Sequence, residues 1–432
     1  MASSLLLNFS VSATLSASIL FNLGRRSLDR YIVSFDRNLR DTAAFSKLLS
    51  RPKDSFVDGI THLSTKDDGL EPDVVLEYPS IAVVSATLSE AEVFSLKTNP
   101  LVSSIRKSRK VQGSPILSSS LFQAPPPETL AATAWHVSLV NADKCWAQTT
   151  GKGVKVGIID SEIDPNLANL PIVDGRSFNP DAPDWRGTDD PHGTFCAAII
   201  GCRNTNGSMV GIAPECDLFA LRTNKNGQGT VDYLIAAMGW AAANKLDIVS
   251  MSQRDFTGAD DPHEPYWEDL NRAAEECTKA GCIVVGIAGN SGAQSNPWVT
   301  NPGRCPQVIA VGGTRQDDSW WTSSSYGPDD LPQEEAVEIV APGDHVFSIM
   351  PGGIFVPGSG TSFAAPQVAG ACALLKQLRP DLTPAQLRTL LKTASRDLGP
   401  QGRDANLELA AWIAWQQSTL FLVCSALTEG AR

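Results

Sequence analysis

The chain has 432 residues, of which 42% are hydrophobic and 19% are charged, a composition typical of a soluble globular protein with a sizeable core. This length predicts one large domain accompanied by a smaller one. The net charge of −12 argues against nucleic acid as the main partner, because phosphate binding needs a basic face.

Residues 1–28 contain the stretch MASSLLLNFSVSATLSASILFNLGRR, which is free of acidic residues and rich in Ser, Leu and Ala. Arg25 and Arg26 follow its apolar part, whereas the basic residues of a secretory signal precede it. We predict a targeting segment and secretion. A degenerate signal peptide, an organelle transit segment and a plain extension all fit, so an organellar or intracellular location stays open. The apolar runs are too short to predict a membrane span.

The nine cysteines are odd in number and spread along the chain, and none has the spacing of zinc ligands. We expect the protein to be a monomer. An odd number of cysteines then leaves at least one thiol unpaired. Whether any disulfide exists is left open.

Residues 29–111 predict a small α+β unit. The stretches RYIVSF, SIAVVSATL and LVSSIRKSRKV predict strands, and TAAFSKLLSR and SEAEVFSLKTNP predict helices. This order is typical of an open-faced sandwich. Residues 112–134 are rich in Ser and small residues and contain three consecutive prolines, which indicates a linker.

Residues 135–415 alternate between short β-branched runs and amphipathic helical stretches. The runs GVKVGIID, DLFALRT, LDIVSMS, CIVVGIAG, QVIAVGG and VEIVAPG predict strands. This pattern predicts an α/β fold with a doubly wound, mainly parallel sheet and helices on both faces. Active sites in such folds lie at the C-terminal ends of the strands. Residues 416–432 are left as a C-terminal extension.

Four segments place polar residues where chemistry is expected. Asp160 ends an apolar strand, and His192 precedes an apolar helix in the stretch DDPHGTFCAAIIG. Asn290 follows a buried strand in VVGIAGNSG, and Ser362 opens a helix of small residues in GSGTSFAAPQVAG. Each residue alone has an ordinary explanation as a turn or helix cap. Their combination in the order Asp, His, Asn, Ser is far more specific.

The motifs IIDSEID, HGT, AGNSG and GTSFAAPQVAG resemble those of the subtilase family of serine peptidases, and the likeness extends over about 135–400. Residues 29–111 resemble the inhibitor-I9-like propeptide of that family. The resemblance implies a serine endopeptidase made as a self-inhibited zymogen, with a processing site in the linker 112–134. It implies polypeptide substrates, with the chain's own propeptide as an intramolecular inhibitor.

The resemblance also implies the roles of single residues. Ser362 would be the nucleophile, His192 the general base, Asp160 the residue that orients the imidazole, and Asn290 an oxyanion donor. The substrate would lie extended along edges that contain Gly227, Gly229, Ser252, Gln253, Arg254, Ala288 and Gly289.

Two positions depart from the family pattern. Glu162 stands where Gly is usual, and we expect its side chain to point to solvent; the alternative is a carboxylate near His192 that raises the pKa of the imidazole. Arg254 also stands where Gly is usual. It would either narrow the first specificity pocket and place a positive charge there, or turn outward toward Asp255, Asp260 or Asp261.

No cofactor is expected for catalysis. Structural calcium is a possibility that no clear motif supports: CRNTNGSMVG occupies the place of one family calcium loop, and Asn169 stands where an Asp ligand is usual. Two other functions stay open, a catalytically silent scaffold and a peptide ligase or macrocyclase that uses the same residues.

Overall fold

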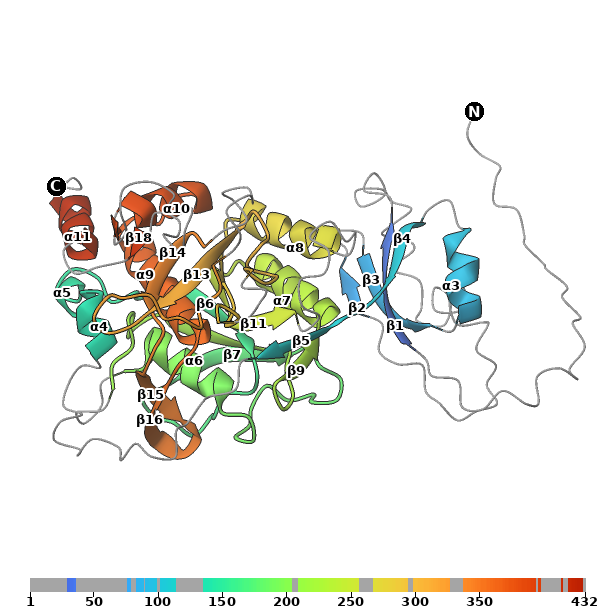
Figure 1. Cartoon of the computed structure of the whole chain (residues 1–432), viewed down its shortest axis with the longest axis horizontal. Coiled ribbons are helices and arrows are strands. Elements are labelled where there is room, and N and C mark those ends of the chain that lie inside the picture. Colours follow the sequence, from blue (N-terminus) through green and yellow to red (C-terminus); the bar gives the residue numbers. More distant parts are fainter. Residues whose placement is uncertain are drawn as a thin grey trace, which may run out of the picture.

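The computed structural model describes residues 29–35, 76–78, 83–88, 90–98, 102–113, 135–203, 209–255, 267–293, 298–326, 337–393, 395–397, 413–414 and 419–429. A large α/β unit and a small unit lie next to each other, and β5 (Lys110–Gly113) runs from the small unit into the large one (Figure 1).

The large unit is built on a sheet with the order β17-β18-β14-β13-β12-β10-β6-β8-β7. Its strands are β6 (Lys155–Asp160), β7 (Ile172–Ser177), β8 (Asp217–Arg222), β10 (Ile248–Met251), β12 (Ile283–Ile287), β13 (Val308–Thr314), β14 (Ile339–Pro342), β17 (Arg396–Asp397) and β18 (Ile413–Ala414). The seven strands from β14 to β7 are parallel to their neighbours. The six strands predicted from β-branched runs are confirmed, and so is the predicted fold class.

Helices cover both faces of this sheet. Alternate residues of one strand belong to different cores: Ile158 packs with one face and Ile159 with the other. On the Ile158 side lie α6 (His192–Gly201) and α9 (Thr361–Leu378), and on the Ile159 side lie α7 (Val231–Ala243) and α8 (Trp267–Lys279) (Figure 1). This arrangement follows from the period of two along a strand.

The remaining elements of the large unit surround this core. They are α4 (Trp135–Leu139), α5 (Ala142–Cys145), the hairpin of β15 (Val346–Met350) and β16 (Ile354–Gly358) with η5 (Pro351–Gly353) at its tip, α10 (Pro384–Thr393) and α11 (Thr419–Glu429). Helix α11 lies in the predicted C-terminal extension and packs against α5 and α9.

The small unit is an antiparallel sheet with the order β2-β3-β1-β4 and one helix. Its elements are β1 (Asp29–Phe35), β2 (Leu76–Tyr78), β3 (Val83–Leu88), α3 (Glu90–Lys97) and β4 (Val102–Lys107). Strand β2 was not predicted, and the helix predicted at 42–51 lies outside the described residues. The single strand predicted at 101–111 is in fact two strands, β4 and β5, which belong to different sheets.

A second, three-stranded sheet joins the two units. Strand β5 lies at its centre, between β9 (Gln228–Thr230) and β11 (Gln253–Asp255), and is antiparallel to both. Residues 110–113 therefore fill the space between two edge strands of the large unit.

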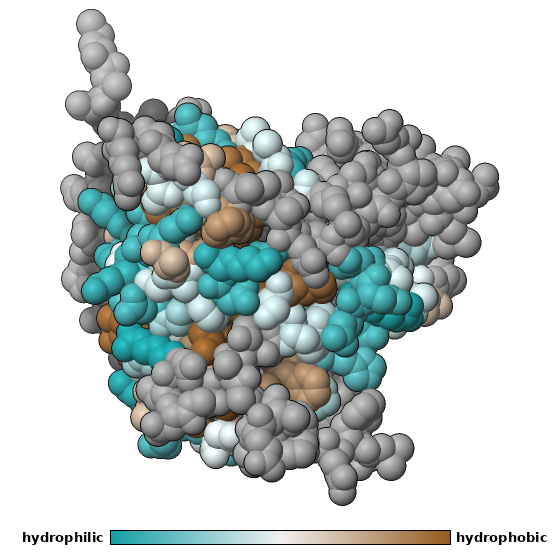
Figure 2. All heavy atoms as spheres, turned by 90° about the vertical axis from the view of Figure 1, so that its left-hand side faces the viewer, coloured by the Kyte–Doolittle hydropathy of each residue, from teal (hydrophilic) through white to brown (hydrophobic). Residues whose placement is uncertain are grey.

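All nine cysteines fall within the described residues, where each is buried and free, so none of them forms a disulfide. No helix in the described part of the chain is long and apolar enough to cross a membrane. Figure 2 shows hydrophobic residues on one face as separate patches among hydrophilic ones. The large exposed hydrophobic residues of the described segments, Phe94, Val173 and Ile354, come from three different elements.

Candidate active site

Asp160 and His192 meet at the C-terminal edge of the central sheet. Strand β6 ends at Asp160, and α6 begins at His192. The His192 Nδ1 atom lies 2.7 Å from Asp160 Oδ1, and both side chains are buried. Asp160 Oδ1 also accepts a hydrogen bond of 2.7 Å from the backbone N–H of Ser161. The other ring nitrogen, Nε2, has no hydrogen-bond partner among the described residues.

The electrostatics of this pair favour the charged imidazole. Burial lowers the pKa of His192, but the negative Asp160 and the neighbouring Cys196 more than offset this effect. The pKa of His192 therefore lies well above its usual value. The group can act as a base only above that pKa.

Ser362 lies in the first turn of α9, next to Phe363, whose ring centroid is 5.8 Å from that of His192. The Ser362 Oγ is 3.5 Å from the carbonyl oxygen of Ser252, and the Ser252 hydroxyl donates a 2.9 Å hydrogen bond to the Ser362 carbonyl. The Cys196 thiol contacts both His192 and Ser362. Its sulfur lies 3.8 Å from His192 Nδ1 and 3.5 Å from the Ser362 carbonyl oxygen. Three elements, β6, α6 and α9, thus bring Asp160, His192 and Ser362 together.

The side-chain amide of Asn290 is held in one orientation by Thr361. Asn290 Oδ1 accepts hydrogen bonds from the Thr361 backbone N–H at 2.9 Å and the Thr361 hydroxyl at 2.8 Å. A Cβ atom on Gly360 would lie 3.5 Å from Asn290 Nδ2 and 3.6 Å from the Ser362 nitrogen. The Nδ2 group and the Ser362 N–H therefore border the same small space.

The two predicted edge glycines lie in and just before β9, where each has contacts within the chain. We expected both to allow close approach of a substrate backbone. Gly227 has a φ of 71° and donates its N–H to Asp190 Oδ2 at 2.7 Å. A Cβ on Gly229 would lie 2.5 Å from Asn224 Oδ1, so this glycine makes room for the chain's own packing. Gly227 directly precedes β9, and Gly229 is the middle residue of β9 and pairs with Val111 of β5.

The side chain of Gln253, a predicted substrate-binding residue, points into the protein. It is fully buried, and its Nε2 donates to the Thr223 hydroxyl at 2.6 Å and to the Ile159 carbonyl at 3.2 Å. Successive side chains of a strand alternate between faces, so Gln253 offers β5 only its backbone.

Arg254, the next residue, contacts the segment that carries Asn290. Its Nη1 donates to the Ser291 hydroxyl at 3.1 Å, and burial lowers its pKa, although a guanidinium stays charged in proteins. Of its three predicted acidic partners, Asp260 and Asp261 lie outside the described residues, as does the side chain of Asp255. The outward alternative therefore stays a prediction.

Ala288 and Gly289 lead from β12 into Asn290. The Ala288 side chain is fully buried. Gly289 has a φ of 109° and donates its N–H to the Thr361 hydroxyl at 3.2 Å. A side chain at Gly289 would be strained and would meet Thr300 at 2.8 Å. These two residues support the position of Asn290 and Thr361.

The expectation that Glu162 points to solvent is wrong. Its side chain is only 2% exposed and forms an ion pair of 2.5 Å with Arg222. The φ angle of Glu162 is not positive, so a Glu in place of Gly at this position causes no backbone strain. Sequence reasoning missed Arg222 because it lies 60 positions away along the chain.

The described part of the candidate calcium region has its own contacts. The Asn169 carbonyl accepts the Arg203 N–H at 2.7 Å, and residues 204–208 lie outside the described residues. Among the described residues, Asp160, His192 and Cys196 have potential metal-ligating atoms that all lie within 4.8 Å of one another, and these residues belong to the candidate active site. These observations do not test the possibility of structural calcium.

The fold and the site define an α/β protein with an Asp–His pair and a serine at adjacent strand and helix ends. A family model described as the subtilase family matches residues 151–407. The chain is 30% identical to an alkaline protease of Alkalihalobacillus alcalophilus, over 90% of this chain and 92% of that protein. It is 29% identical to alkaline elastase YaB of Bacillus sp. strain YaB, over 90% of this chain and 92% of the relative.

A further relative is subtilisin E of Bacillus subtilis, which is 29% identical over 75% of this chain and 78% of its own length. The chain belongs to the subtilase family. The enzyme class predicted from the motifs, a serine-type endopeptidase, is confirmed at this level.

Proposed function

We propose that this chain hydrolyses peptide bonds with Ser362 as nucleophile, His192 as general base and Asp160 as the residue that orients the imidazole. The observation that carries the proposal is the 2.7 Å contact between His192 Nδ1 and Asp160, which leaves Nε2 on the side of the ring away from the carboxylate. His192 takes the proton of the Ser362 hydroxyl as the oxygen attacks the carbonyl, and later delivers it to the leaving amine. The base, the orienting group and the donors are all protein groups, so these steps need no cofactor.

Asn290 Nδ2 and the Ser362 N–H would hold the negative oxygen of the tetrahedral intermediate. Two observations support this role: both donors border the space beside Gly360, and Thr361 fixes the orientation of the amide. Donors that are held in place before the reaction stabilise the transition state without reorganisation.

We further infer that the chain is a self-inhibited zymogen. Residues 110–113 pair with β9 and β11 as an extended substrate would, which supports a propeptide that ends in the substrate site. The Val111 side chain is buried in the apolar cluster that contains Val231 and Tyr233. The similarity to the alkaline protease covers 90% of the chain, more than the predicted catalytic region alone. We also propose that the propeptide is removed by cleavage within residues 112–134 and that the protein is secreted.

The contact between Arg254 and Ser291 supports a charged pocket wall. Because the guanidinium binds Ser291, the residue after Asn290, we infer that it disfavours Lys and Arg before the scissile bond and tolerates acidic or small polar residues. A peptide-library profile of Arg254→Gly against wild type tests this inference. We expect cleavage after Lys and Arg to rise several-fold in the variant, and coinciding profiles would exclude Arg254 from substrate selection.

Labelling with a fluorophosphonate tests the proposed nucleophile. We expect one label, on Ser362, and none in the Ser362→Ala variant. The wild type is labelled after activation, because the zymogen is self-inhibited. An activated wild type that stays unlabelled would instead support the silent scaffold. Mass spectrometry of peptide products distinguishes hydrolysis from ligation, because a ligase would join the acyl group to an added amine.

A further inference from the structure

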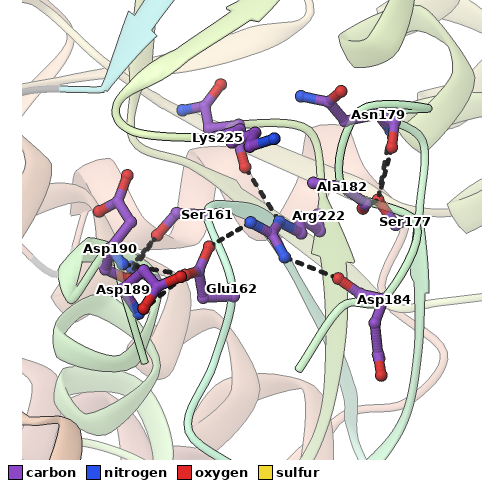
Figure 3. Close-up of polar contacts among 12 residues, drawn as sticks. Ser161, Glu162, Ser177, Asn179, Ala182, Asp184, Asp189, Asp190, Arg222 and Lys225 are labelled. Atoms are coloured by element: carbon purple, nitrogen blue, oxygen red, sulfur yellow. Dashed lines mark hydrogen bonds and ion pairs between the residues drawn. The ribbon is translucent and has the colours of Figure 1, made fainter. Parts of the chain in front are cut away.

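Glu162, two residues after the proposed triad residue Asp160, forms a buried ion pair with Arg222. Glu162 Oε2 lies 2.5 Å from Arg222 Nη2, and Glu162 Oε1 accepts the backbone N–H groups of Asp189 at 3.0 Å and Asp190 at 2.9 Å (Figure 3). One carboxylate thus binds a cation with one oxygen and the loop before His192 with the other.

The surrounding backbone is shaped around this side chain. A Cβ atom on Gly187 would lie 2.7 Å from Glu162 Cγ, so the loop can pass the glutamate only because residue 187 has no side chain. The Glu162 side chain is therefore an integrated part of this region and not a surface group that happens to fold inward.

Arg222 extends the same device to the end of β8. Its Nη1 donates to the Asp184 carbonyl at 2.8 Å and its Nε to the Asn224 carbonyl at 3.1 Å. The guanidinium thereby balances the buried charge of Glu162 and binds the beginning of the same loop. A buried carboxylate without such a partner would be strongly unfavourable.

Asp190 carries the effect of this pair to the reacting residues. Its Oδ1 accepts the His192 backbone N–H at 3.1 Å, and its Oδ2 accepts the Gly227 N–H at 2.7 Å, next to β9. Its carbonyl accepts the Ser161 hydroxyl at 3.2 Å, and that hydroxyl in turn accepts the Gly193 N–H at 2.8 Å. Asp190 therefore links the start of α6, the turn after Asp160 and one strand that pairs with β5.

We propose that the Glu162–Arg222 pair is a positioning device, which fixes loop 184–190 so that Asp190 sets the place of both His192 and the β9 edge. This inference rests on the proposed function of the triad. Neither Glu162 nor Arg222 touches the reacting atoms. They act through the backbone of Asp190, and small displacements of a catalytic base are costly because proton transfer needs a fitted geometry.

The test compares kcat and KM of full-length preparations after activation, with active sites counted by fluorophosphonate labelling. For Glu162→Ala we expect kcat per labelled site to fall by about 10- to 100-fold with KM changed less than about threefold. Glu162→Gln keeps an oxygen for the two N–H groups, so we expect it to retain much more of kcat. Arg222→Met leaves a buried carboxylate unbalanced, and we expect the double variant Glu162→Gln/Arg222→Met to recover part of its loss.

Arg186→Ala is the matched control, because the Arg186 side chain is half exposed and contacts residues of its own loop, the Asp184 carboxylate and the Trp185 ring. We expect its kcat to equal that of wild type. The inference is overturned if Glu162→Ala keeps kcat within about twofold per labelled site, or if Glu162→Ala and Glu162→Gln lose kcat equally. Should Glu162→Ala fail to fold, the Gln and double variants still decide. Failure of the proposed function is distinct, because wild type itself would then carry no label on Ser362.

Discussion

The His192 imidazole is buried between a carboxylate and a thiol, and this environment determines when it can act as a base. Burial by itself disfavours the imidazolium, while Asp160 and Cys196 stabilise it more strongly, so the net effect raises the pKa of His192. A base with a raised pKa stays protonated to higher pH. The enzyme should therefore work best in alkaline solution.

We accordingly expect kcat/KM to rise with pH through a midpoint above the ordinary histidine value of about 6.5. The sign follows from the mechanism, because only the neutral imidazole can take the Ser362 proton. Measuring kcat/KM for a peptide amide from pH 5 to 10 checks this expectation, with a second substrate whose own groups do not titrate as the control. A midpoint at or below 6.5 would contradict the stabilisation by Asp160.

The sequence predicted the positions of Asp160, His192, Asn290 and Ser362 because Asp160 and Asn290 follow apolar strands, and His192 and Ser362 open helices of small and apolar residues. It could not predict the place of Glu162. A glutamate beside a turn is usually solvated, and its burial depends on Arg222 at the end of another strand. Such pairing is a property of the tertiary structure and leaves no local pattern.

Two aspartates in the first turns of α7 and α8 connect these helices to the small unit. Asp232 accepts hydrogen bonds from Arg30, Ser85 and Ser108. Asp269 accepts one from Ser34 at 2.6 Å and one from Arg106 at 2.8 Å. In sequence both resemble ordinary acidic residues at a helix N-terminus. In the structure their side chains are fully buried beneath the small sheet.

Asp269→Ala in the catalytic unit should weaken inhibition by an added N-terminal fragment. The substitution leaves Ser34 without its acceptor and removes the buried one of the two carboxylates that bind Arg106. Losing one partner of a buried charge pair costs about 2–5 kcal/mol, or roughly 30-fold or more in the inhibition constant. The measurement is that constant for one fragment, residues 1–113, against wild-type and variant mature enzymes.

Glu268→Ala provides the control at the neighbouring position. Glu268 also pairs with Arg106, but its side chain is 63% exposed, so the inhibition constant should change less than about fivefold. Equal effects of the two substitutions would show that the buried contacts of Asp269 are not what holds the small unit.

At the level of elements, six strands of the large unit were predictable because they are continuous apolar runs that are largely buried: β6, β8, β10, β12, β13 and β14. Strand β7 was not predicted, and it is largely exposed. The small unit was less predictable. Strand β2 has three residues, too few for a pattern, and the break between β4 and β5 falls in the polar stretch around Ser108 and Arg109. Only the pairing of β5 with β9 and β11 separates them, and these partners are more than a hundred residues away.

The stability of the whole molecule should depend on pH through His136, at the N-terminal side of the large unit. Its ring is fully buried, and neither nitrogen has a hydrogen-bond partner among the described residues. Burial lowers the pKa of His136 to about 3, against about 6.5 in an unfolded chain. Because the folded-state pKa is the lower one, the unfolded state takes up a proton first as the pH falls. Stability is therefore lost progressively below about pH 6.5.

Between pH 8 and pH 4.5 this group alone should lower the free energy of unfolding by about 2–3 kcal/mol. Urea titrations of Ser362→Ala protein, which prevents self-digestion, measure the change. The double variant His136→Leu/Ser362→Ala should lose about 2–3 kcal/mol less stability than Ser362→Ala between pH 8 and pH 4.5. An identical pH dependence in both proteins would show that His136 does not titrate with unfolding.

The molecule as a whole brings together the proposed triad, from β6 and the neighbouring helices α6 and α9, and a strand from its N-terminal part that pairs with β9 and β11. The central proposal is that Ser362 is the nucleophile that cleaves peptide bonds. The most direct measurement is the digestion of an unstructured protein by activated wild type and by Ser362→Ala, with peptide mapping of the products. We predict cleavage by wild type and none by the correctly folded variant. Equal cleavage by both proteins would contradict this account.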